Sequence, residues 1–217
     1  MLSLSCPSCG ATVPFKSKAS VFAVCSYCRS TLVRHDMDLE AVGKMAELQD
    51  DLTPLQIGTT GKYKGKAFEI IGRMKVSYDD GFWNEWYLYF AEGKHKEGWL
   101  AEAQGFYAVC FEVDESVAPA RNDASTLQPG RLVEFKNNGF FEIEDIREVK
   151  CLVSEGELPV NAPKGRESLS VDLTGPDTQM ATIEYAKDEI RVFAGGYQDF
   201  DDFKFHNLRE IEGWKHV

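Results

Sequence analysis

Two cysteine pairs near the start of the chain constrain its fold more than any other feature. Cys6 and Cys9 form one Cys-x-x-Cys motif, and Cys25 and Cys28 form a second, fifteen residues further on. This spacing predicts a four-cysteine zinc site, since each pair can point two sulfurs at one metal ion. With sulfur at all four positions, the zinc would be structural, one ion per chain, with no open position for an activated water.

The residues around these pairs predict a zinc ribbon over residues 1–35. Gly10 follows the first pair, where a tight turn often needs a positive φ. The apolar runs at residues 21–24 and 31–33 are typical of hairpin strands. A domain of fewer than about 40 residues has too little core to fold alone, so the ribbon should depend on its metal. Redox-active cysteine pairs are the alternative.

Charge is distributed unevenly along the chain. The formal net charge is −11, yet residues 1–35 contain no Asp or Glu and carry the cations Lys16, Lys18, Arg29 and Arg34. The remaining residues therefore carry about −15, which opposes nucleic-acid binding by the chain as a whole. The four cations are expected mainly to offset the metal thiolates, and a local nucleic-acid patch is the alternative.

The residues after the ribbon predict a linker helix and then a β-rich region. Apolar side chains within residues 36–54 recur at helical spacing, and Pro54 would end the helix. From residue 55 onward, short runs rich in aromatic and β-branched residues alternate with glycine-rich turns, which is typical of strands. These runs lie at residues 66–76, 82–90, 98–103, 106–113, 131–135, 140–153, 168–173, 181–185 and 190–194.

An internal repeat divides the β-rich region. Leu-Gln-Ile-Gly at residues 55–58 recurs as Leu-Gln-Pro-Gly at 127–130, and Phe-Glu-Ile at 68–70 recurs at 141–143. The spacing within each copy agrees to one residue, so two halves are predicted, residues 55–116 and 127–217. The predicted fold class is mainly β: a small zinc ribbon, a short linker helix and two related halves that are barrel-like or sandwich-like.

Several motifs in this region resemble one bacterial family. They are Phe-Glu-Ile-Ile-Gly-Arg at residues 68–73, Trp-Asn-Glu-Trp-Tyr at 83–87, Gly-Trp-Leu-Ala-Glu-Ala-Gln-Gly at 98–105, Glu-Gly-Glu-Leu-Pro at 155–159 and Ala-Thr-Ile-Glu-Tyr at 181–185. Together they are similar to the uncharacterised family catalogued as domain of unknown function 4178. The resemblance implies an N-terminal zinc ribbon as a companion domain. It implies no activity, and its association with polyamine-synthesis and membrane-stress genes is not a mechanism.

The sequence contains no recognised catalytic motif. GxGxxG, the P-loop, GxSxG and HExxH are all absent. Cys151 alternates with apolar neighbours and is predicted to be a buried core thiol, whereas Cys110 lies on the face opposite its apolar neighbours. Neither cysteine is spaced as a metal ligand.

The strand predicted at residues 82–90 carries aromatic residues on both faces. Trp83, Tyr87 and Tyr89 alternate on one face, and Trp86 lies on the other. A second aromatic face indicates either burial on both sides or a contact surface for a protein partner. Trp83, Tyr87 and Tyr89 are therefore candidate partner-binding residues.

Two main function classes fit these observations. The preferred one is a non-enzymatic zinc-ribbon adaptor that acts through protein–protein contacts. The alternative is an enzyme with an acidic site between the two halves, for which Glu85, Glu157 and Glu184 are candidates. Nucleic-acid binding by the ribbon is a weaker alternative. A concave pocket around Glu85 or Glu157 would favour the enzyme, and a flat exposed aromatic patch would favour the adaptor.

The chain is expected to be cytoplasmic. Its first residues lack the basic start and apolar run of a signal peptide, and no later stretch has the roughly 18 apolar residues that cross a bilayer. In a reducing compartment, cysteine pairs hold metal more often than they form disulfides.

Overall fold

A computed structural model of the protein describes residues 2–45, 52–93, 96–114, 118, 126–135, 139–187 and 189–211. These residues form fifteen β-strands and one short 3-10 helix, and no α-helix occurs among them. The fold is therefore mainly β, as the sequence predicts.

The strands fall into a small N-terminal group and a larger group. The first comprises β1 (Leu2–Ser5), β2 (Thr12–Phe15), β3 (Phe22–Val24), β4 (Ser30–His35) and β5 (Asp38–Lys44). The second comprises β6 (Thr60–Tyr63), β7 (Lys66–Tyr78), β8 (Gly81–Phe90), β9 (Glu97–Ala103), β10 (Phe106–Val113), β11 (Leu132–Phe135), β12 (Gly139–Leu158), β13 (Glu167–Thr174), β14 (Gln179–Ala186), β15 (Ile190–Tyr197) and the helix η3 (Phe200–Phe203). Each strand run predicted from residue 66 onward corresponds to one of these strands.

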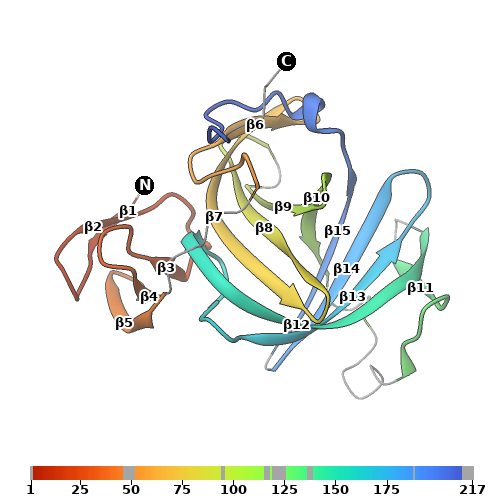
Figure 1. Ribbon diagram of the computed structural model, residues 1–217, viewed down its shortest axis with the longest axis horizontal. Helices are drawn as coiled ribbons and strands as arrows, with labels where there is room; N and C mark the ends of the chain where they lie inside the picture. The colour runs from red at the N-terminus through yellow and green to blue at the C-terminus, as the bar shows by residue number, and fades with distance from the viewer. Residues whose placement is uncertain are drawn as a thin grey trace.

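Eight strands of the second group close into an antiparallel barrel (Figure 1). β7 to β10 form one four-stranded meander, and β12 to β15 form another. β10 pairs with β15, and β12 pairs with β7, so the ring returns to its first strand. Closure pairs the edge strands of both meanders, which would otherwise expose unpaired backbone groups.

The two meanders contain matching hydrogen bonds. The amide of Gly58 donates to the carbonyl of Ile70 at 2.8 Å, and the amide of Gly130 donates to that of Ile143 at 2.8 Å. The two glycines have φ values of 87° and 85°. Each precedes a short strand, β6 or β11, that pairs with the first strand of its meander. The halves are thus alike and share one barrel; their origin by duplication stays a prediction.

The inward face of the ring forms the largest apolar core. Tyr87 of β8, Cys110 of β10, Cys151 of β12 and Phe193 of β15 belong to one buried cluster. Because these strands lie all around the ring, their shared cluster must fill its interior.

The outward face of each half has a core of its own. In the first half, Trp86 packs in a cluster with Phe203 of η3. In the second half, Ile143 packs in a cluster with Val133 of β11. The short strands and η3 therefore cover apolar faces that would otherwise meet water.

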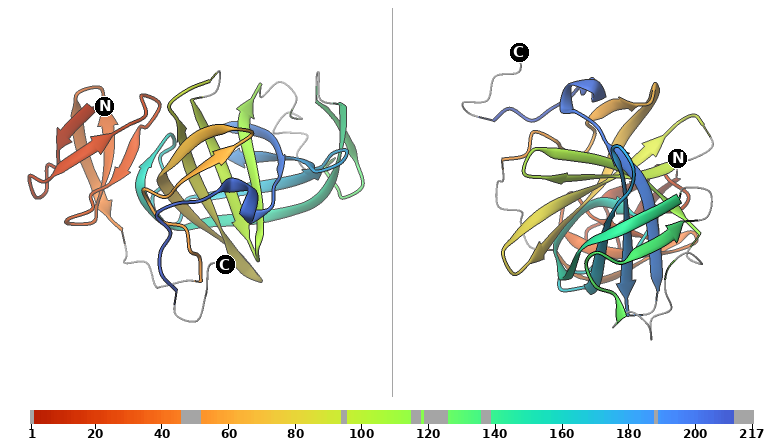
Figure 2. Two further views of the ribbon diagram at one scale, coloured as in Figure 1. Left: turned by 90° about the horizontal axis from the view of Figure 1, so that it is seen from above. Right: turned by 90° about the vertical axis from the view of Figure 1, so that its right-hand side faces the viewer.

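Three of the N-terminal strands, β3 to β5, are continuous with the barrel sheet, whereas β1 and β2 form a two-stranded sheet of their own. β3 pairs with the end of β12, placing Ala23 opposite Glu157 and Phe22 opposite Leu158. The amide of Val21 also donates to the carbonyl of Leu158 at 2.9 Å. The left view of Figure 2 shows the two parts side by side.

The predicted linker helix is wrong where the structure describes it. Asp36 has a φ of 52° and lies in a tight turn, after which β5 pairs with β4. The segment with helical apolar spacing is short, and a short isolated helix is only marginally stable. Pairing with the free edge of β4 also satisfies backbone hydrogen-bonding groups that such a helix leaves to water. Residues 46–51 of the predicted helix lie outside the described residues.

Candidate functional site

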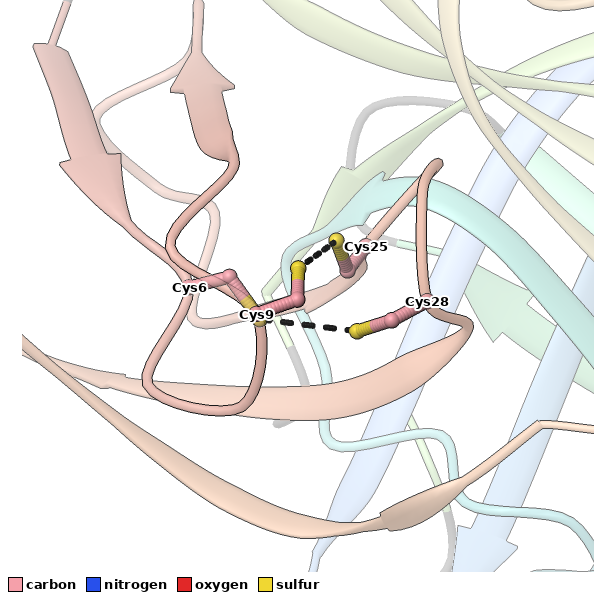
Figure 3. A group of neighbouring side chains, drawn as sticks. All are labelled: Cys6, Cys9, Cys25 and Cys28. Carbon is pink, nitrogen blue, oxygen red and sulfur yellow. Dashed lines mark hydrogen bonds between the residues drawn. The ribbon is translucent and has the colours of Figure 1, made fainter.

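The four cysteines of the two motifs converge on one point from two turns (Figure 3). Their sulfurs all lie within 4.8 Å of one another. Cys6 Sγ is 3.7 Å from Cys28 Sγ, and Cys9 Sγ is 3.8 Å from Cys25 Sγ. These distances are far longer than the roughly 2.05 Å of a disulfide bond.

The two turns have the same backbone geometry. The amide of Gly10 donates to the carbonyl of Cys6 at 2.8 Å, and the amide of Arg29 donates to that of Cys25 at 3.0 Å. Gly10 and Arg29 have φ values of 76° and 62°. Each turn therefore needs a left-handed residue directly after its second cysteine, which the sequence signals only at Gly10.

The sulfur spacing fits a tetrahedral metal ion. Zn–S bonds of about 2.3 Å place the sulfurs of a tetrahedron about 3.8 Å apart. The two measured pairs match this edge length. The four cysteines could therefore hold one metal ion with no ligand position left for substrate.

A loop of the ribbon is held against the barrel by a buried carboxylate. Glu157 is 4% exposed and accepts hydrogen bonds from the amides of Lys16, at 2.7 Å, and Ser17, at 3.2 Å. Burial nevertheless raises the pKa of Glu157 above its ordinary value. Glu157 also lines a pocket of about 210 Å³ at this seam. Its role in the structure is to fasten the ribbon to β12.

The same loop reaches one end of the barrel. Ser17 Oγ donates to Glu97 Oε1 at 2.8 Å, and the hydroxyl of Tyr87 lies 3.4 Å from the same Ser17 oxygen. Beside this contact lies a pocket of about 300 Å³, which we call the mouth pocket. It is lined by Ala19, Tyr87, Lys96, Glu97, Gly98, Trp99, Glu112, Pro159 and Arg191.

Arg191 is the buried cation of the mouth pocket. Its Nε and Nη2 donate to the two carboxylate oxygens of Glu112, at 3.1 and 2.8 Å. Tyr87 and Trp99 form an aromatic pair with ring centroids 5.1 Å apart. The pocket therefore combines an aromatic wall with charges of both signs.

Deeper in the barrel lies a group of half-buried polar side chains. Glu85 of β8 accepts a hydrogen bond from Trp83 Nε1 at 3.0 Å. Burial, followed by the charge of Glu184, raises the pKa of Glu85 to about 7. Asp172 accepts from Thr182 at 3.0 Å, and burial raises its pKa as well.

Two of the three predicted acidic candidates therefore come together. Glu85 and Glu184 lie close enough inside the barrel for the charge of Glu184 to raise the pKa of Glu85, and Arg166 pairs with Glu184 at 2.5 Å. Glu157 lies instead at the ribbon seam. Cys151 is 3% exposed and Cys110 is 6% exposed, so both thiols are buried in the core. The burial predicted for Cys151 is confirmed.

The predicted aromatic contact residues face the barrel interior. Tyr87 is 1% exposed, so the prediction of a partner surface is wrong for this residue. Trp83 and Tyr89 are half-buried and pack against the interior core. Trp83 also pairs with the ring of Tyr78 at 5.7 Å. The strand is thus covered on both faces, which was the alternative left open by its sequence.

The ribbon cations are engaged by neighbouring groups. Lys16 pairs with Glu69, and Arg29 lies 3.8 Å from Glu155. Arg34 donates to the carbonyl of Lys18 at 2.6 Å. Three of the four cations are therefore occupied within the chain, which leaves little for a nucleic-acid patch.

Sequence reasoning missed a buried polar network on the outer face of the first half. Arg73 donates to Asn84 Oδ1 through Nε and Nη2, at 3.1 and 2.7 Å. Asn84 and Trp86 both donate to Glu102 Oε2, at 3.1 and 2.9 Å. Thr53 donates to Glu102 as well, at 2.7 Å.

The signal for this network was the set of family-like motifs. Arg73, Asn84, Trp86 and Glu102 all lie within the first three of them along the chain. Each of the four is at most 7% exposed. A polar residue such as Asn84 on an otherwise apolar strand face is the clue that a buried partner exists.

Comparison with known proteins gives a family and no function. A family model described as "Domain of unknown function (DUF4178)" matches residues 56–200. No curated protein and no solved structure matches the chain. Among the described residues, no helix is both long and apolar enough to cross a membrane.

Proposed function

The chain belongs to the DUF4178 family, to which no activity is assigned, and from this premise we propose that it is a non-enzymatic binding protein. The ribbon and the barrel act as one unit, and the mouth pocket between them is the binding site. The observation that carries this proposal is that residues of both parts, Ala19 and Trp99 among them, line the same pocket. An eight-stranded barrel is wide enough either to be filled by side chains or to hold one small ligand, and here the mouth pocket lies at one end of an interior that side chains fill.

The metal in this proposal is zinc, and its role is structural. Four thiolates in a tetrahedron are a typical zinc set, and thiolate ligands favour Zn²⁺ over harder ions. In the proposal, the metal fixes the ribbon so that its loop at Ser17 can reach the barrel. A reducing, cytoplasmic location would keep the thiols available for metal.

The adaptor hypothesis changes in one respect. Binding through an exposed aromatic face loses its support because Tyr87 is buried and Trp83 packs inward. The binding role therefore passes from a protein partner to a small ligand, which a concave pocket suits better than a flat surface does.

One observation favours the enzyme alternative. A carboxyl group with a pKa near 7, as for Glu85, is suited to general acid–base catalysis at neutral pH. In that case a ligand of the mouth pocket would be converted to product, and Glu85→Gln would abolish conversion while leaving binding intact. Mass spectrometry of ligand incubated with each variant distinguishes an enzyme from a binding protein.

The binding proposal is tested by thermal shift with chemically diverse small metabolites. A ligand at one hundred times its dissociation constant should stabilise the protein by about 2.7 kcal/mol. Ala19→Trp fills the mouth from an exposed position and should remove this stabilisation. Lys18→Trp, at the adjacent exposed position, is the matched control and should respond like the wild type. The proposal is rejected if a ligand stabilises Ala19→Trp as much as the wild type, or if no class of metabolite stabilises the wild type.

A further inference from the structure

The mouth pocket is lined by charges of both signs. Lys96 and Arg191 are its cations, and Glu97 and Glu112 are its carboxylates. The formal charge of this lining is therefore balanced. A ligand of high net charge of either sign would meet repulsion from two of the four groups.

The guanidinium group of Arg191 has one edge that could bind a ligand. Its Nε and Nη2 are used by Glu112. Within the described part of the chain, Nη1 has no hydrogen-bond acceptor, although the side chain lines the pocket. A guanidinium held in place by one carboxylate is well suited to bind a second carboxylate through its remaining N–H groups.

Glu97 is the complementary group. Its Oε1 accepts the hydrogen bond from Ser17, which fixes the carboxylate at the rim. The side chain is half-buried, and it lines the pocket together with Ala19. A fixed, partly desolvated carboxylate is suited to bind an ammonium group.

The third element is the aromatic wall. Trp99 is 6% exposed and Tyr87 is 1% exposed, and their rings lie together at the inner side of the pocket. Such a wall favours an apolar or aromatic group placed between the two charged ends.

From this arrangement we infer that the mouth pocket binds a small zwitterion of the amino-acid class with a large apolar side chain. Its carboxylate contacts Arg191 and Lys96, its ammonium contacts Glu97, and its side chain packs on Trp99. The volume of about 300 Å³ suits one molecule of this size rather than a peptide. This inference rests on the proposed binding function and adds the chemistry of the ligand.

The experiment is isothermal titration of the full chain with L-phenylalanine and L-leucine. N-acetyl-L-phenylalanine lacks the ammonium, and L-phenylalaninamide lacks the carboxylate. We expect each blocked form to bind at least tenfold more weakly than L-phenylalanine, because a hydrogen bond to a charged group is lost.

Variants assign each end of the ligand to its residue. Glu97→Gln should weaken binding of L-phenylalanine about tenfold and leave the N-acetyl form unchanged. Arg191→Lys should weaken L-phenylalanine and leave the amide unchanged. Because Arg191 is buried and its variant could unfold, Lys96→Gln at an exposed position provides the same comparison.

The outcomes separate this inference from the proposal beneath it. Blocked and free forms that bind equally, or variants that weaken all forms alike, overturn the zwitterion assignment. Binding of a neutral polyol or a fatty acid, blocked by Ala19→Trp, overturns the assignment and retains the binding function. If no small molecule binds at the mouth pocket, both the zwitterion assignment and the proposed binding function are rejected.

Discussion

The hydroxyl of Ser17 in the ribbon donates a hydrogen bond to Glu97 Oε1 at the rim of the barrel, at 2.8 Å. The two residues are 80 positions apart in sequence. Ser17 is 2% exposed, and its amide is bound by Glu157. One residue of the ribbon thus contacts both the end of β12 and the mouth pocket, so the metal site and the pocket are mechanically linked.

Ser17→Ala should loosen this link. The change removes the hydrogen bond to Glu97 and leaves the amide of Ala19, which donates to Ser17 Oγ at 3.0 Å, and the Tyr87 hydroxyl without this partner. We therefore expect a loss of about 1–3 kcal/mol in the free energy of unfolding. Urea denaturation measures the loss. Ser8→Ala, at an exposed position in the first cysteine turn, should change stability by less than about 0.5 kcal/mol. Equal effects of the two variants would contradict the role of Ser17.

Metal removal should release the ribbon loop from the barrel. Purified protein should contain about one zinc ion per chain by elemental analysis, and Cys6→Ser or Cys25→Ser should lose it. The amides of Lys16 and Ser17, which donate to Glu157, should then exchange hydrogen much faster. Unchanged protection of these amides in metal-free protein would show that the loop holds without the metal.

The two tryptophans of β8 should differ in their contribution to stability. Trp86 is 0% exposed and donates to Glu102, so Trp86→Ala should cost about 3–5 kcal/mol. Trp83 is half-buried and donates a hydrogen bond to Glu85, so Trp83→Ala should cost clearly less. Guanidinium denaturation of both variants measures the difference, and a larger cost at Trp83 would contradict the packing described.

Glu85 should make stability depend on pH. Its pKa is raised from 4.5 to about 7 in the folded protein, so folding favours the protonated form. Its contribution is fully present below about pH 4.5 and is lost as pH rises through about 7, by at most about 1.4 kcal/mol per pH unit. Glu85→Gln should remove this part of the dependence and be more stable than wild type at pH 8. Denaturant unfolding of the wild type and of Glu85→Gln at several pH values from 5 to 8 tests this. If the free energy of unfolding changes with pH by the same amount in both proteins, the prediction is refuted.

Gly72→Ala should disrupt barrel closure. A Cβ atom at Gly72 would lie 2.0 Å from the backbone carbonyl oxygen of Glu157, so β7 and β12 would have to separate. We expect a loss of several kcal/mol. Gly105→Ala is the comparison: its Cβ meets no atom within 4 Å, and only its φ of 87° opposes the change, at about 1–2 kcal/mol. Thermal melts of the two variants should separate clearly, and similar losses would contradict the close approach.

The sequence by itself determined the features that depend on local pattern. The spacing of Cys6, Cys9, Cys25 and Cys28 predicted one converging cluster, because a two-residue gap leaves both sulfurs of a pair on one side of a turn. The alternation of apolar residues predicted the strands from residue 66 onward, since one buried face repeats every second residue. The local pattern gave a wrong prediction at β5. The apolar spacing there is suited to a helix, but the segment forms a strand that pairs with the free edge of β4.

Only the tertiary structure decided which strand faces turn inward and which distant residues meet. Alternation separates Tyr87 from Trp86, but closure of β12 onto β7 makes the face of Tyr87 the interior of a barrel. Closure likewise brings Glu85 near Glu184, 99 positions apart in the chain. Such contacts depend on strand order and register, which long-range pairing sets and no short window of sequence contains.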